Sequence, residues 1–175
     1  MHTNIDRQPP GLHRENTLSL YAADKLIAQA RVLAAEYRET MGKPLPGISN
    51  EIAEHDAMRL MQLQPAPANA SGYHAVDPAR NDLRVQIKSR AVIDETKSNQ
   101  RMGQLNVNQD WDSVLLVIMD REYNPTEIYE AYRDELEEHI YESSSSRAKR
   151  GALSVAKFKK ISRLAWSVEQ GIIPE

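Results

Sequence analysis

The stretch DLRVQIKSRAV (residues 82–92) decides the fold class, because it alternates between apolar and polar residues. A two-residue period places alternate side chains on opposite faces of a β-strand. The apolar face carries Leu83, Val85 and Ile87, and the polar face carries Arg84, Gln86, Lys88 and Arg90. The stretch therefore predicts a strand that turns one face toward a core.

A second stretch, VLLVIM (residues 114–119), is apolar throughout and rich in β-branched residues, which is typical of a buried central strand. Further strands are predicted at about 73–77 and 127–132. Helical spacing predicts helices over about 17–37, from Ser49 or Asn50 to about Leu63, and over the acidic segment 133–141. The polar connection between about 94 and 110 is expected to be partly helical. Two helices followed by strands with intervening helices predict an α/β domain around a mixed sheet.

The 175 residues fit one domain and contain no internal repeat. We predict a flexible arm over 1–15, an N-terminal helix over 16–43 and the α/β domain over 44–175. The chain contains no cysteine, so any metal must be held by oxygen or imidazole ligands, and the five histidines show no paired spacing. No apolar run resembles a signal peptide or a membrane span, so we expect a cytoplasmic protein without a membrane partner.

The charges are segregated along the chain, although the net charge is only −3. Acidic residues concentrate in 127–142 and basic residues in 147–163. A basic surface is typical of nucleic-acid binding, because neutralising phosphates supplies much of the affinity. The predicted phosphate-contacting residues are Arg84, Arg90, Arg147, Lys149, Arg150, Lys157, Lys159 and Lys160. The alternative is that both segments are simply solvated faces.

Four residues suggest a chemical site because of their order and setting. Glu51 lies in the first turn of the second helix, Asp77 ends a strand before a turn, and Gln86 and Lys88 share one face of the next strand. Phosphodiester hydrolysis needs charge neutralisation and an activated water, and a hard divalent cation with oxygen ligands supplies both. Asp77 is the expected central ligand, with Gln86 and Glu51 completing the metal site and Lys88 stabilising the transition state. Glu54 is the alternative helix acid.

Three segments resemble the core of the PD-(D/E)xK nuclease superfamily: GISNE (47–51), GYHAVD (72–77) and RVQIKSR (84–90). Glutamine in place of the second acid is similar to Mrr-type restriction endonucleases. The span 47–166 resembles a poorly characterised bacterial family of this fold, in which WDSVLLVIMDREY (111–123) and EIY (127–129) match a strand pair and 154–166 the terminal strand. Two departures are that Val76 replaces the proline before the aspartate, and that Gln86 carries no charge.

The resemblance implies a restriction-endonuclease-like core, with a central mixed sheet flanked by helices, and Mg²⁺ dependence with Mn²⁺ as a substitute. It assigns Glu51, Asp77, Gln86 and Lys88 to the active site. We therefore predict a metal-dependent endonuclease or exonuclease that acts on nucleic acid, with DNA as the first expectation, in restriction or mobile-element defence. One alternative is a catalytically silent domain of this fold that binds DNA or a protein. Another is an accessory protein that assembles through the N-terminal helix and the acidic segment. A homodimer is compatible with each hypothesis.

Overall fold

A seven-stranded mixed sheet forms the centre of the computed structural model, which describes residues 14–91, 100–142 and 152–175. The strand order is β1-β2-β3-β5-β6-β8-β9, and β3 and β5 are the only parallel neighbours among these described strands. The strands are β1 (Gln64–Pro65), β2 (Ala75–Asp77), β3 (Leu83–Ala91), β5 (Ser113–Met119), β6 (Pro125–Tyr132), β8 (Arg163–Ser167) and β9 (Gly171–Ile172). A second, two-stranded sheet pairs β4 (Arg101–Gln104) with β7 (Ala152–Ser154). The predicted α/β class with a mixed sheet is confirmed.

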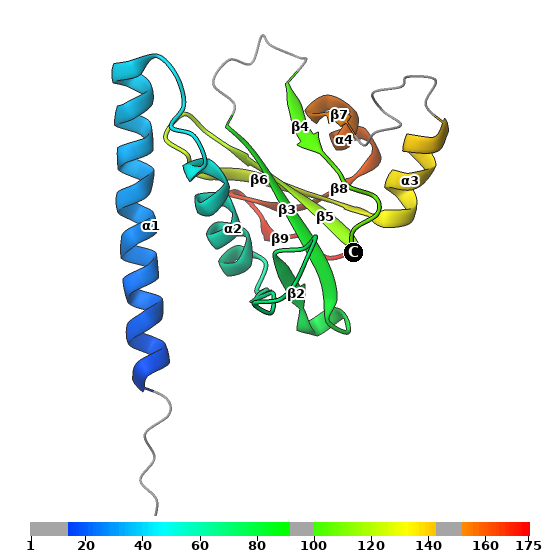
Figure 1. The fold of residues 1–175 in the computed structure, drawn as a ribbon, viewed down its shortest axis with the longest axis horizontal. Coiled ribbons are helices and arrows are strands. Elements are labelled where there is room, and N and C mark those ends of the chain that lie inside the picture. Colours follow the sequence, from blue (N-terminus) through cyan, green and yellow to red (C-terminus); the bar gives the residue numbers. More distant parts are fainter. Residues whose placement is uncertain (1–13, 92–99, 143–151) are drawn as a thin grey trace, which may run out of the picture.

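Helices cover both faces of the sheet (Figure 1). They are α1 (Arg14–Met41), α2 (Ile48–Leu60), α3 (Arg133–Glu142) and α4 (Val155–Ile161), together with the short 3-10 helix η1 (Pro78–Arg80). Figure 1 shows α2 between α1 and the sheet, with α3, α4 and the small β4–β7 sheet on the other side. Among the described helices, none combines the length and apolar character needed to cross a bilayer.

The core has two layers, one on each face of β5. All seven residues of β5 are buried, which confirms the stretch VLLVIM as a central strand. Leu115, Val117 and Met119 pack in the layer that includes α2, whereas Val114, Leu116 and Ile118 pack in the layer toward α3 and α4. Apolar side chains on both faces therefore fix this strand in the middle of the domain.

The long helix α1 is held by polar contacts as well as by packing. Ala34 is fully buried against the first core layer. Arg31 donates to Asp56 of α2 at 2.8 Å, and both Arg31 and Arg38 donate to backbone carbonyls of the turn between β5 and β6. One face of α1 is thereby attached to the domain.

Three details differ from the expectations. The N-cap of α2 is Gly47, at φ 82°, so Ser49 and Asn50 lie inside the first turn and do not cap it. The described part of the connection expected to be partly helical contains strand β4. The stretch 154–166, expected as a terminal strand, contains α4 before β8, because the Ser154 hydroxyl accepts from the Lys157 amide at 3.1 Å and caps a helix. Of the predicted N-terminal arm, 1–13 lie outside the described residues, and α1 begins at Arg14.

Candidate functional site

Four polar residues lie close together where β3 extends beyond its pairing with β2. Glu51 and Glu54 come from α2, His74 directly precedes β2, and Lys88 belongs to β3. We call these residues the edge cluster. The first turn of α2 is tied to β3 by a 2.8 Å hydrogen bond from the Ser89 hydroxyl to the Asn50 side-chain oxygen. This bond holds the two glutamates beside the strand that carries Lys88.

His74 is fixed against β3 by two hydrogen bonds. Its backbone amide donates to the Val85 carbonyl at 2.9 Å, and its Nδ1 accepts from the Ile87 amide at 2.9 Å. Because Nδ1 is an acceptor, the proton of the neutral ring lies on Nε2, which is 3.8 Å from the Glu54 carboxylate. His74 therefore presents an N–H donor to the cluster, and Nε2 is not available to bind a metal in this arrangement.

The charges of the edge cluster act on one another. Burial lowers the pKa of Lys88, and Arg90 lowers it further, while Glu54 opposes the shift. Burial and the neighbouring Glu51 raise the pKa of Glu54, and Lys88 opposes that shift. Burial and Lys88 lower the pKa of His74 below its ordinary 6.5, against the influence of Glu51, so the ring is neutral at pH 7. The ammonium, the two carboxylates and the imidazole thus share one site.

Gln86 contributes a buried amide whose oxygen is unused. The side chain is 4% exposed, and its Nε2 donates to the Gly72 carbonyl at 2.9 Å. Its Oε1 has no hydrogen-bond partner among the described residues. A buried acceptor without a partner is costly in a folded protein, so this oxygen is a candidate ligand-contacting atom.

The backbone at Gly72, whose carbonyl accepts that bond, favours glycine. Its φ is +96°, and a Cβ at this position would lie 2.5 Å from the Cβ of Gln109. We expect Gly72→Ala to destabilise the fold by about 1–3 kcal/mol, since it combines a backbone strained for alanine with a steric clash. Urea unfolding measures the effect. Gly42→Ala is the matched control, because Gly42 also has a positive φ but a Cβ added there would have nothing within 4 Å. Equal losses in both variants would contradict the role assigned to the Gln109 contact.

Asp77 does not join the edge cluster, and the predicted convergence of Asp77 with Lys88 is wrong. Asp77 pairs with Leu83 in the β2–β3 register. Leu83 and Lys88 are five residues apart on β3, an odd number, so the side chains of Asp77 and Lys88 leave opposite faces of the sheet. Both Asp77 carboxylate oxygens are engaged: one accepts from the Ala79 amide at 2.9 Å and the other from Arg80 Nε at 2.7 Å. Asp77 caps η1 in this structure, and its assignment as a metal ligand stays a prediction.

The edge cluster suits a divalent cation that keeps several water ligands better than one held by protein ligands alone. The described residues contain no group of three or more His, Cys, Asp or Glu side chains placed to hold a metal ion. Glu51 and Glu54 nevertheless form a carboxylate pair, in which burial raises the pKa of Glu54 and repulsion from Glu51 raises it further. Mg²⁺ commonly binds through one or two carboxylates and retains several waters.

Most of the described basic candidates are already paired within the chain. Arg84 forms a bidentate ion pair with Asp112, with N–O distances of 2.9 and 2.7 Å. Arg90 donates to the backbone carbonyls of Ser89 and Arg101. Lys159 binds Glu127 at 2.6 Å. Lys160 is exposed and Lys157 half-buried, and no ion pair joins either lysine to another described residue. Arg147, Lys149 and Arg150 lie outside the described residues.

The sequence-based site is therefore partly assembled. The structure brings Glu51 and Lys88 together, adds Glu54 and His74, and leaves Asp77 elsewhere, while the Gln86 amide binds the Gly72 carbonyl. The GYHAVD segment contains His74, but the segment alone does not show that His74 lies beside Gln86. That neighbour follows from the β2–β3 register. A scan of the chain against protein-family models finds no match, and a search of curated proteins finds no related sequence.

Proposed function

We propose that the edge cluster is the active site of a metal-dependent phosphodiesterase that acts on nucleic acid, with DNA as the first substrate to test, on a restriction-endonuclease-like core. The observation that supports it best is the grouping of half-buried Lys88 on β3 with the carboxylates of half-buried Glu54 and exposed Glu51 on α2. Partly burying a lysine and a glutamate is costly unless the charges serve each other or a ligand.

The cation would be held by Glu51 and Glu54, with the unpartnered oxygen of Gln86 as a further ligand. When bound, such an ion supplies Lewis-acid stabilisation of the phosphate and lowers the pKa of a coordinated water. Lys88 places a positive charge where negative charge develops on the phosphate oxygens. His74 directs its Nε2–H, 3.8 Å from Glu54, toward the place of a phosphate oxygen, and its fixed Nδ1 bond keeps the ring in that orientation.

The proposal is tested by cleavage of plasmid and single-stranded substrates across Mg²⁺ and Mn²⁺ titrations. We expect Glu54→Gln to lower the rate at limiting metal by about tenfold or more, because one of two carboxylate ligands is lost. Higher metal concentrations should recover part of this rate. Metal affinity of the unmodified protein should also fall as the pH drops through the raised pKa of Glu54, since protons compete with the cation there.

Asp77→Asn is the matched control, because it makes the same acid-to-amide change outside the edge cluster. It retains an oxygen that can accept from the Ala79 amide, so cleavage and its metal dependence should remain close to those of the unmodified protein. Loss of cleavage in Asp77→Asn, with Glu54→Gln unaffected, would overturn the assignment of the site to the edge cluster.

A binding-only domain is the second candidate, and it is favoured by the engagement of Asp77 and by the absence of a three-ligand metal group among the described residues. Such a domain would bind nucleic acid with strong salt dependence and would cleave none of the substrates with any metal. That result would replace the phosphodiesterase proposal with this one.

A further inference from the structure

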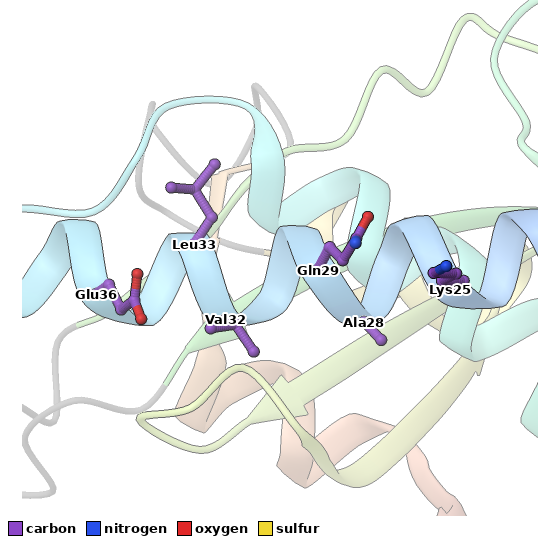
Figure 2. A pocket seen from close by; sticks show the side chains of 6 residues that line it. All are labelled: Lys25, Ala28, Gln29, Val32, Leu33 and Glu36. Carbon is purple, nitrogen blue, oxygen red and sulfur yellow. The ribbon is translucent and has the colours of Figure 1, made fainter.

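The outward face of α1 carries exposed apolar side chains between two opposite charges. Lys25, Ala28, Gln29, Val32, Leu33 and Glu36 are all exposed and line a shallow hollow on the helix (Figure 2). Val32 is 58% and Leu33 55% exposed. Their spacing of three and four residues places them on one helix face, opposite the face that packs Ala34 into the core.

This face is complementary to itself in an antiparallel arrangement. If two copies of α1 cross antiparallel about a two-fold axis between residues 30 and 31, Lys25 of each copy meets Glu36 of the other. In the same register Ala28 meets Leu33, and Gln29 meets Val32. A parallel pair would instead place Lys25 against Lys25 and Glu36 against Glu36. Within one chain the two charges are 11 residues apart, about 16 Å along the helix, so they cannot pair with each other.

We propose that this face of α1 is the interface of an antiparallel homodimer. Its centre is Val32 and Leu33 packed against Gln29 and Ala28 of the second copy, and its two ends are Lys25–Glu36 ion pairs related by symmetry. A two-fold axis requires the same patch on both partners, which the order basic, apolar, acidic satisfies. Since one helix pair forms the contact, the buried area is at the low end for specific interfaces, below about 1,200 Å², and dimerisation should depend on concentration.

Sedimentation equilibrium of the full chain tests the proposal. We expect Lys25→Glu and Glu36→Lys each to weaken dimerisation by about tenfold or more, because each change replaces two attractive contacts by two repulsive ones. The double variant Lys25→Glu/Glu36→Lys should restore dimerisation toward that of the unmodified protein. Raising the ionic strength should reduce the difference between single and double variants.

Glu169→Lys is the matched control, because Glu169 is exposed on the turn after β8 and should not affect self-association. Circular dichroism of every variant shows whether the fold is kept, and all positions changed are exposed. An unmodified protein that stays monomeric at all concentrations would overturn the proposal. A dimer that both single variants leave intact, or that the double variant fails to restore, would also overturn it.

Discussion

Replacing Lys88 with methionine is expected to lower phosphodiester cleavage by about 10²-fold or more, the usual scale for losing one positioned electrostatic group. Methionine keeps much of the length of the lysine side chain and removes only the ammonium. The proposed ligands of the cation remain, so the concentration of Mg²⁺ giving half-maximal activity should change little. Cleavage of a plasmid at saturating metal measures the effect.

Stability should move in the opposite direction to activity in this variant. Because burial lowers the pKa of Lys88, the folded protein binds a proton there less tightly than the unfolded chain does. A lysine with a lowered pKa destabilises the folded protein most at pH values low enough to keep its ammonium charged. Methionine carries no charge and removes that cost. We therefore expect Lys88→Met to be at least as stable as the unmodified protein at pH 7.

Lys43→Met is the matched control for both measurements, because Lys43 is exposed in the connection between α1 and α2. It should leave cleavage and unfolding unchanged. If Lys88→Met cleaves as fast as Lys43→Met, Lys88 does not act in the reaction. If Lys88→Met loses activity together with stability, the loss reflects unfolding and the electrostatic role is wrong.

The main strands were predictable because their patterns are local. The alternation over 82–92 and the apolar run over 114–119 identify β3 and β5, and the acidic segment identifies α3. Strands β4 and β7 are short and pair with each other outside the main sheet, so neither has a period long enough to recognise. Helix α4 depends on the Ser154 cap, a single hydrogen bond that a search for apolar periodicity does not detect.

The candidate site was less predictable, because it depends on register. Asp77 and His74 are three residues apart, so they leave opposite faces of the same extended segment, and only the pairing of Ala75 with Val85 shows which one lies beside Gln86. The distinction between Glu51 and Glu54 depends on how α2 rests on β3, which the Ser89–Asn50 bond fixes. Residue types and spacing indicated the chemistry, whereas the three-dimensional pairing determines which residues take part.

Glu130 offers the prediction with the largest effect on stability. Its carboxylate is fully buried and accepts from Arg80 at 2.9 and 3.0 Å, from Arg163 at 2.6 Å and from the Ser113 hydroxyl at 3.0 Å. Burial opposes the charge of Arg80, but hydrogen bonds from Arg80 to Glu130 and Asp77 outweigh it and raise the pKa of Arg80. We expect Glu130→Ala to cost about 3–5 kcal/mol of unfolding free energy, because two arginines lose their shared buried partner.

Glu127→Ala on the same strand is the matched comparison. Glu127 also forms an ion pair, with Lys159 at 2.6 Å, but both side chains are about one-third exposed. Solvent screens such a pair, so its loss should cost no more than about 1 kcal/mol. Urea unfolding of the two variants at pH 7 separates the cases. Both glutamates lie on β6 and bind basic side chains, but Glu130 is buried and Glu127 is partly exposed. Similar losses of unfolding free energy in the two variants would show that the burial of Glu130 adds nothing to its contribution.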